Sequence, residues 1–330
     1  MAIRHTLCSE VQSGRDICAH MNQVGVRRIN RTRRALLATI CTALAAALIG
    51  CGTSTPHTDT GATDARDGQA PIRVAYGDAP DTYGLLHLPE GSGPHPVVVM
   101  VHGGGWLEEH DLSYFEPLSR SLVDDGVAVW SIEYRRVDGA GGWPLTLADA
   151  DDATEALGTV VQDASGNTLD LDRVHLAGHS AGGHLAAWIA GRHTLPPDSP
   201  GHQPTIRPRS ATIMAGVLDL SLAATDGHDV FVRNLLGGMP DEQPERYRIA
   251  SPIEHLPVRL PVTALHGSAD QTVDPAQSLR YVTAATAAGD PAVLRTLEGV
   301  GHGDFGNVTS SAWAAAKAVI LDHVHARGAE

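Results

Sequence analysis

The pentapeptide Gly178-His179-Ser180-Ala181-Gly182 separates a short apolar run, residues 174–177, from a segment with a helical pattern, residues 183–190. This order predicts a strand, a tight turn and a helix. Glycines two residues before and after a serine let the backbone turn sharply and hold the hydroxyl at the apex of the turn, where the helix begins. We therefore expect Ser180 to be a nucleophile.

Apolar or extended segments alternate with helical patterns from Pro71 onward. Strands are expected at residues 72–76, 82–88, 97–101, 127–132, 174–177, 211–214, 262–265 and 293–297. The later runs are apolar throughout, which suits strands covered on both faces. Helices are expected at about residues 112–125, 146–161, 183–192, 275–288 and 310–326. The pattern predicts one α/β domain over residues 71–330, with a mostly parallel sheet and helices on both faces.

The longest stretch without a clear pattern lies between Leu218 and Pro261. It is interrupted by Gly237-Gly238 and by Pro252, residues that break regular structure. We expect an irregular segment that forms a small lid or a wall of the substrate pocket.

The charge of the chain is divided unevenly. The first 50 residues hold seven Arg and two acidic residues, a net charge of +5, whereas the whole chain carries −14, so the remainder carries −19. The only lysine is Lys317. Because a nucleic-acid surface needs clustered Lys and Arg, we expect no nucleic-acid partner.

Residues 1–50 are expected to form an export signal. An arginine-rich stretch, residues 27–34, precedes fifteen apolar or small residues, 35–49, which are too few to span a bilayer comfortably. Residues 32–37 are also similar to a twin-arginine signal. A start at Met21 would give a leader of ordinary length.

All four cysteines lie within the first 51 residues, which leaves no disulfide framework and no cysteine-ligated metal site for the rest of the chain. Cys51 ends the sequence Leu48-Ile49-Gly50-Cys51, which resembles a bacterial lipobox. This resemblance implies that Cys51 is lipidated and anchors the protein at the outer face of the membrane. The alternative is a plain signal peptide and a secreted protein. Residues 51–70 are polar and are expected to be a flexible tether.

Two further motifs follow predicted strands. The strand at residues 262–265 leads into Asp270, and the strand at 293–297 leads into His302. A serine nucleophile needs a base, and the base needs a carboxylate that fixes its tautomer. The order Ser180, Asp270, His302 is the chain order found in α/β-hydrolase triads.

A fourth motif, His102-Gly103-Gly104-Gly105-Trp106, directly follows the strand predicted at residues 97–101. Glycines lack side chains, so backbone N–H groups in this loop can approach a substrate oxygen closely. We expect this loop and the Ala181 N–H to form an oxyanion hole.

With these four motifs the chain resembles the α/β-hydrolase superfamily. Within it, the chain is similar to carboxylesterases and lipases with a His-Gly-Gly-Gly-Trp loop, which are related to hormone-sensitive-lipase-like esterases and kynurenine formamidases. The resemblance covers roughly residues 71–330. It implies Ser180 as nucleophile, His302 as general base and acid, and Asp270 as the residue that orients the histidine. The oxyanion donors that it implies are Gly103, Gly104 and Ala181.

The chain departs from the hormone-sensitive-lipase-like pattern in one respect. Those enzymes place a helical cap ahead of the glycine loop, but the segment from Pro71 to His102 has room for two strands and no cap. We therefore expect no large N-terminal cap, and an acyl pocket built from other loops.

Several residues near the motifs have a simpler structural interpretation. Asp274 precedes Pro275 and is expected to cap a helix rather than to orient His302. Asp304 is expected to be a loop or cap residue. His102 and His179 are expected to shape their turns by hydrogen bonds. Trp106 is expected to pack beneath the glycine loop, and the alternative is that it lines the pocket. The sequence shows no metal-ligand spacing and no nucleotide fingerprint, so we expect no metal and no cofactor.

These features favour an exported, membrane-tethered serine carboxylesterase that acts on small to medium acyl esters. One alternative is an arylformamidase or another amidase, although its usual substrate is cytosolic. A second is a serine peptidase, although no accessory domain of the kind common in such peptidases is evident. A third is a non-catalytic surface lipoprotein that serves in binding.

Overall fold

The computed structural model describes residues 69–326. These residues form an eight-stranded sheet with the order β1-β2-β4-β3-β5-β6-β7-β8. The strands are β1 (Ile72–Ala75), β2 (Tyr83–His87), β3 (His95–Val101), β4 (Ala128–Ile132), β5 (Leu169–His179), β6 (Ser210–Met214), β7 (Val262–Gly267) and β8 (Ala292–Leu297). The pairs β1–β2 and β2–β4 are antiparallel, and all other neighbours are parallel. The prediction of a mostly parallel sheet is confirmed.

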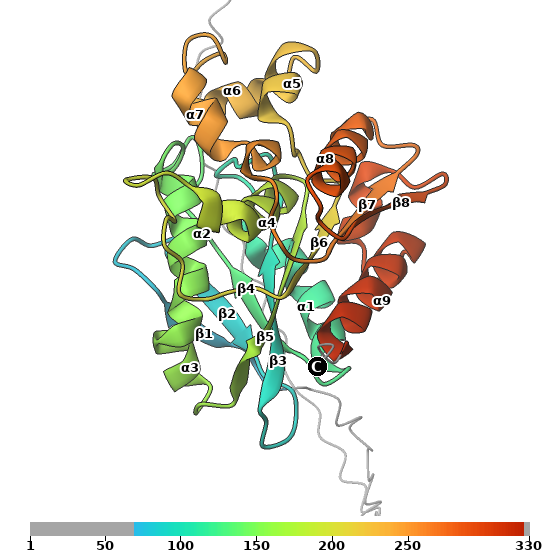
Figure 1. Ribbon diagram of the computed structural model, residues 1–330. Helices are drawn as coiled ribbons and strands as arrows, with labels where there is room; N and C mark the ends of the chain where they lie inside the picture. Colours follow the sequence, from blue (N-terminus) through green and yellow to red (C-terminus); the bar gives the residue numbers. More distant parts are fainter. Residues whose placement is uncertain (1–68, 327–330) are drawn as a thin grey trace, which may run out of the picture. The chain divides into compact units, whose positions relative to one another are not determined.

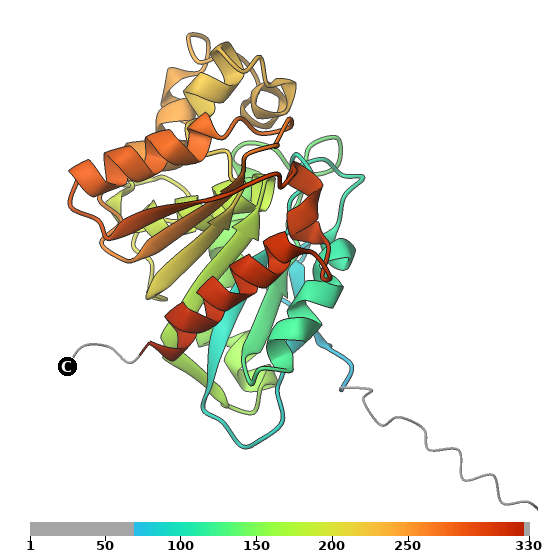
Figure 2. The ribbon, with the colours of Figure 1, turned by 90° about the vertical axis from the view of Figure 1, so that its right-hand side faces the viewer.

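Helices cover both faces of the sheet (Figure 1). One face carries α1 (Glu116–Val123) and α9 (Ser311–His325), and Figure 2 shows α9 lying across it. The other face carries α2 (Leu145–Glu155), α3 (Val160–Ala164), α4 (Ala181–Gly191) and α8 (Ala276–Ala287). The five expected helices are present, but the first begins with the 3-10 turn η1 (Leu112–Phe115), and the 3-10 turn η2 (Ala156–Gly158) divides the second.

The side chains of β3 show why its apolar run is uninterrupted. Val97, Val99 and Val101 belong to the core on the side of α2 and α4, whereas Val98 and Met100 belong to the core on the side of α1 and α9. All five are fully buried. Successive side chains of a strand point to opposite faces, so a strand covered on both sides needs an apolar residue at every position.

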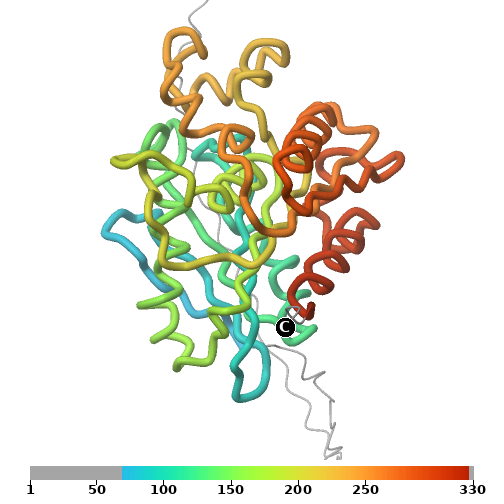
Figure 3. The backbone as a smooth tube through the Cα atoms, viewed as in Figure 1, coloured from blue at the N-terminus to red at the C-terminus, as the bar shows by residue number. Residues whose placement is uncertain are grey.

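The segment between β6 and β7 is helical. It contains α5 (Leu220–Thr225), α6 (Val230–Leu236), α7 (Pro244–Ala250) and the 3-10 turn η4 (Pro252–His255). Figure 3 shows this segment in yellow and orange at the top of the view. The sequence predicts an irregular stretch here, and that prediction is wrong. The helices are only six or seven residues long, too short for a clear period in the sequence. Aspartate side chains cap the first two of them.

The four sequence motifs meet at one edge of the sheet. They follow β3, β5, β7 and β8, which are all parallel, so their carboxyl ends lie at the same edge. In open α/β sheets, ligands bind at this edge. Between residue 69 and the glycine loop the described chain forms β1, β2 and β3 and no helix, as expected.

Residues 1–68 are outside the described part of the chain, and with them the predicted export signal, Cys51 and nearly all of the predicted tether. None of the helices within residues 69–326 combines the length and the hydropathy that are needed to cross a membrane.

Candidate active site

Ser180 lies at the turn between β5 and α4. Its φ of 56° and ψ of −121° place it in a region that residues other than glycine rarely adopt. The turn is held by two backbone hydrogen bonds, from the Ser180 N–H to the Met214 carbonyl (2.9 Å) and from the His184 N–H to the Ser180 carbonyl (3.0 Å). Backbone strain of this kind persists only where the surrounding structure maintains it, and it is concentrated at functional sites.

The two glycines of the pentapeptide are required by close backbone contacts. A Cβ atom on Gly178 would lie 2.1 Å from the carbonyl oxygen of Gly182. A Cβ atom on Gly182 would lie 2.1 Å from the carbonyl oxygen of Val101, at the end of β3. The same glycines that permit the turn therefore bring Ser180 close to the glycine loop.

Asp270 and His302 are in direct contact. The Nδ1–H of His302 donates to Oδ2 of Asp270 at 2.7 Å, and Oδ1 accepts the N–H groups of Thr272 (2.8 Å) and Val273 (2.9 Å). Burial opposes ionisation of Asp270, but hydrogen bonds from His266, His302 and these two N–H groups hold its pKa far below the usual range. The carboxylate is therefore ionised, and it fixes the His302 tautomer that leaves Nε2 free to accept a proton.

The two other acidic residues near His302 serve as caps. Asp274 accepts the N–H of Ala276 (2.9 Å) at the start of α8. Asp304 accepts the N–H of Gly301 (2.8 Å) at the start of the 3-10 turn η5 (His302–Gly306). The interpretation of both as capping residues is confirmed.

Two glycines of the loop, Gly104 and Gly105, line the same cavity as Ser180. They have φ angles of 105° and 63°, which favour glycine. Within residues 69–326, neither N–H donates to another protein group. Ala181 also lines this cavity, and as the first residue of α4 its N–H has no partner in the helix.

Gly103 requires a correction. Its N–H donates to the hydroxyl of Tyr114, eleven residues further along the chain, and Gly103 is not among the residues that line the cavity. The loop donors that remain available are therefore Gly104 and Gly105, not Gly103 and Gly104. Three consecutive glycines in the sequence mark the loop, but they do not reveal which N–H groups the folded protein has already paired.

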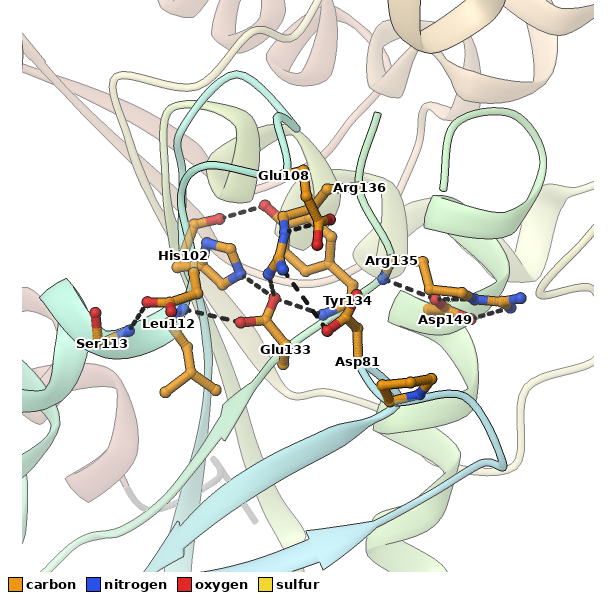
Figure 4. A network of polar contacts seen from close by, with 12 residues as sticks. Asp81, His102, Glu108, Leu112, Ser113, Glu133, Tyr134, Arg135, Arg136 and Asp149 are labelled. Atoms are coloured by element: carbon orange, nitrogen blue, oxygen red, sulfur yellow. Dashed lines mark hydrogen bonds and ion pairs between the residues drawn. The ribbon is translucent and has the colours of Figure 1, made fainter. Parts of the chain in front are cut away.

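A buried polar network holds His102, the first residue of the glycine loop (Figure 4). Glu133 accepts hydrogen bonds from Nε2 of His102 (2.8 Å), from the N–H of Leu112 (3.0 Å) and from Arg136. Burial opposes ionisation of Glu133, but His102 and Arg136 lower its pKa. The hydroxyl of Tyr134 donates to the carbonyl of His102 (2.9 Å). Sequence reasoning identified His102 as a structural residue but missed Glu133, which belongs to no motif.

Ser180, Asp270 and His302 line one cavity of about 1480 Å³ at this edge of the sheet. Trp106 is 1% exposed, with its ring edge-on to His184 at 5.2 Å, and it is also among the residues that line the cavity. The helices between β6 and β7 supply part of the wall, as the sequence predicts. Apolar side chains in the wall include Val217, Leu222, Ala223, Phe231 and Val273, and polar ones include Glu109, His110, Asp226, His228, Gln271 and Arg280.

The structure thus brings the predicted nucleophile, base and carboxylate to one cavity. Among the described residues, no side chain forms a hydrogen bond with the Ser180 hydroxyl, which lies in the cavity with His302. No group of three or more His, Cys, Asp or Glu within residues 69–326 is arranged to hold a metal ion. The catalytic roles of these residues and the absence of a cofactor stay predictions.

Comparison with known proteins gives matches over most of the described chain. Residues 85–284 match the family described as BD-FAE. The esterase LipC of Mycobacterium tuberculosis is 30% identical over 245 residues, which cover 70% of this chain and 59% of LipC. A probable carboxylic ester hydrolase of the same organism, LipM, is 28% identical over 58% of this chain and 45% of its own length. The kynurenine formamidase of Danio rerio is 29% identical over 46% of this chain and 47% of its own. The chain thus spans about half the length of these relatives.

Solved structures agree with the fold. A truncated carbohydrate esterase from gut microbiota superposes with a TM-score of 0.66 and 19% identity, over 78% of this chain and 100% of that one. The butyrate-bound esterase Est2 of Thermogutta terrifontis superposes with a TM-score of 0.61 and 24% identity, over 77% of this chain and 92% of that one. Together with the strand order, these matches confirm the α/β-hydrolase fold.

Proposed function

The chain belongs to the BD-FAE family, whose match covers more than half of its residues, and on this premise we propose that it is a serine hydrolase that cleaves carboxylic esters. One observation carries the proposal. A serine on a strained strand-to-helix turn lines the same cavity as an imidazole that is paired at 2.7 Å with an ionised carboxylate. The esterase names of several relatives support the same reaction class.

The reaction would proceed through an acyl-enzyme. His302 accepts the Ser180 proton while the serine oxygen attacks the acyl carbon, and it then gives that proton to the departing alcohol. Water, activated by the same imidazole, attacks the acyl-enzyme and releases the acid. Asp270 stays ionised and stabilises the imidazolium during both steps.

Backbone donors would stabilise the oxyanion. Gly104, Gly105 and Ala181 line the cavity with Ser180, and among residues 69–326 their N–H groups donate to no other backbone group. Ala181 also begins α4, so the positive end of the helix dipole points at the developing charge. Removal of one such donor costs ~3–4 kcal/mol of transition-state stabilisation in a well-studied serine protease.

We infer that the substrates are small to medium acyl esters, which the cavity has room to hold. Its volume of about 1480 Å³ exceeds the ~300–1,000 Å³ typical of small-molecule sites, so it has room for both an acyl group and an alcohol. The apolar wall around Leu222 and Phe231 suits an acyl chain, and the polar residues at Asp226 and Gln271 suit a hydroxylated alcohol.

A formamidase or amidase is the second candidate. It is supported by the similarity to the kynurenine formamidase of Danio rerio, which the sequence resemblance also implies. The chemistry is the same acyl transfer with an amine as leaving group, so substrate preference separates the two.

We also propose that the protein is exported and anchored at the outer face of the membrane through a lipidated Cys51. This proposal is based on the arginine-rich and apolar segments before Cys51 and on the lipobox-like sequence that ends at it. These residues are outside the described part of the chain.

The test is a substrate panel combined with active-site labelling. Wild-type protein should hydrolyse aryl and alkyl esters of short acids faster than N-formyl aromatics and short peptides, and a fluorophosphonate should label it. Ser180→Ala should abolish labelling and lower kcat by ~10⁴-fold or more. Ser92→Ala, an exposed serine before the amino end of β3, is the matched control and should behave as wild type. Equal turnover by Ser180→Ala and wild type would refute the mechanism, and preferential cleavage of N-formyl aromatics would favour the formamidase.

A further inference from the structure

Tyr114, in η1, lies in the cavity wall close to the nucleophile. A Cβ atom added to Gly103 would lie 2.9 Å from the Tyr114 hydroxyl oxygen and 3.0 Å from Cβ of Ser180. The Tyr114 hydroxyl and the Ser180 side chain therefore both lie next to Gly103. A Cβ atom added to Gly306, at the end of η5, would lie 3.5 Å from the Tyr114 ring. Tyr114 therefore sits between the glycine loop and the turn that begins at His302.

The phenol of Tyr114 has an unused donor. Its oxygen accepts the N–H of Gly103, and a phenol carries one further hydrogen that it can donate. Among residues 69–326, no group accepts that hydrogen, and the side chain lines the cavity. Because hydrogen bonds in a chain polarise one another, the Gly103 N–H makes the phenol a stronger donor.

We propose that the Tyr114 hydroxyl donates a hydrogen bond to the substrate oxygen that becomes negatively charged, beside the backbone donors Gly104, Gly105 and Ala181. The proposal rests on the ester hydrolysis proposed above. When the Ser180 oxygen bonds to the acyl carbon, one electron pair of the carbonyl moves to its oxygen and the serine proton passes to His302. Tyr114 keeps its proton throughout and stabilises the new charge, so Gly103 acts through Tyr114 instead of through its own N–H.

Two properties of the site suit this role. Burial raises the pKa of Tyr114 above its usual range, so the phenol stays protonated at any pH used for an ester assay. The donor is also held in place before substrate arrives, by Gly103 on one side and by Phe115, whose ring is edge-on at 4.7 Å, on the other. A preorganised donor needs no rearrangement as charge develops.

Tyr134 provides a matched control. Its hydroxyl also contacts the glycine loop, by donating to the carbonyl of His102 at 2.9 Å. It is fully buried and is not among the residues that line the cavity. Tyr134→Phe therefore removes one hydrogen bond that holds the loop without removing a donor to substrate.

The experiment compares kcat, KM and melting temperature of Tyr114→Phe and Tyr134→Phe. Loss of one oxyanion donor lowers kcat by ~10²–10³-fold, so Tyr114→Phe should lose about 100-fold in kcat with little change in KM. Tyr134→Phe should lose stability and far less kcat. A Tyr114→Phe variant with the kcat of Tyr134→Phe would overturn the proposal.

A third variant separates donation from a purely structural role. In Tyr114→3-fluorotyrosine the ring and both hydrogen bonds remain, but the phenol is a stronger donor and a weaker acceptor. The proposal predicts a kcat above that of wild type. If the oxygen only held Gly103, kcat would stay the same or fall, which would overturn the proposal even if Tyr114→Phe were unstable.

The outcomes also separate this proposal from the proposed function. If wild-type protein and Ser180→Ala are equally inactive on esters, the hydrolase proposal fails and this one falls with it. If wild-type activity depends on Ser180 but Tyr114→Phe matches Tyr134→Phe, the hydrolase proposal stands and only the role of Tyr114 is refuted.

Discussion

The Nε2–H of His179 donates to the backbone carbonyl oxygen of His302 at 3.1 Å, and the two imidazole rings are 4.7 Å apart. The residue before the proposed nucleophile, Ser180, thus holds the turn that carries the proposed base, His302. Burial, and after it the neighbouring His302, lower the pKa of His179 to about 3. His179 is therefore neutral at neutral pH and does not repel an imidazolium formed on His302.

We predict that His179→Phe lowers kcat by ~10–100-fold, because a displacement of about 1 Å at a catalytic group can cost ~100-fold in rate. Phenylalanine keeps an aromatic ring near Phe115 and Phe305 but removes the donor to His302. Steady-state kinetics with a chromogenic ester measures the effect. His179→Gln, which can still donate, should recover part of the loss, and a wild-type kcat in His179→Phe would show that this hydrogen bond does not position the base.

The second prediction separates Asp270 from Asp274. Asp270→Ala removes the acceptor of the His302 Nδ1–H and should lower kcat by ~10⁴-fold, the factor found for the equivalent change to Asn in a well-studied serine protease. Asp274→Ala removes one capping hydrogen bond at α8 and should cost ~1 kcal/mol of stability while leaving most of the activity. Kinetics and urea unfolding of both variants provide the measurement. An inactive, stable Asp274→Ala beside an active Asp270→Ala would reverse the assignment.

The third prediction concerns stability and pH. His184 is fully buried, and burial lowers its pKa to about 4, against 6.5 for an exposed histidine. Between these two values the unfolded chain binds more protons than the folded protein, so the free energy of unfolding falls as the pH falls. His184 alone should account for about 2 kcal/mol of lost stability between pH 7 and pH 5. Urea unfolding at several pH values measures the slope.

His184→Gln is the control for this slope. Glutamine can donate to the Ala250 carbonyl, which now lies 2.9 Å from Nε2 of His184, but it does not titrate. The variant should lose stability less steeply between pH 7 and pH 5, whatever its stability at pH 7. An unchanged slope would mean that protonation of His184 is not linked to unfolding. His179, with a pKa of about 3, contributes in the same direction.

The fourth prediction tests the anchor. A lipidated N-terminal cysteine carries at least two acyl chains, each worth ~0.8 kcal/mol per buried CH₂, which gives stable membrane attachment. Wild-type protein should therefore sediment with membranes, and Cys51→Ser should be released or remain unprocessed. A chain that starts near Pro71 should be soluble and keep the wild-type kcat, because the described site lies within residues 69–326.

Mass spectrometry of the mature N-terminus gives the decisive measurement for Cys51. An unmodified N-terminus at another position, together with a soluble wild-type protein, would refute lipidation and leave the hydrolase proposal intact. A diacylated or triacylated Cys51 would support it.

The amino-acid sequence by itself determined the strands and the loops that carry chemistry. Apolar runs covered on both faces, such as β3, are visible without any partner, because burial on both sides demands apolar residues at each position. The turn at Ser180 is equally local. Gly178 and Gly182 are needed there because a Cβ atom would clash with backbone atoms of the turn itself or of the neighbouring strand. These features predict the parallel sheet. With the motifs that follow β7 and β8, they also predict that Ser180, Asp270 and His302 lie close together at one edge of it.

Only the tertiary structure decided which polar groups at the site are already hydrogen-bonded within the protein. The Gly103 N–H is paired with Tyr114, and Glu133, which directly follows β4, accepts a hydrogen bond from His102, so neither contact can be deduced from the spacing of the motifs. The short helices α5 and α6, which wall the cavity, depend on aspartate caps and on packing rather than on a long periodic pattern. A buried polar group forms hydrogen bonds with the groups that the fold places next to it. These partners are often distant in the sequence, so only the three-dimensional structure identifies them.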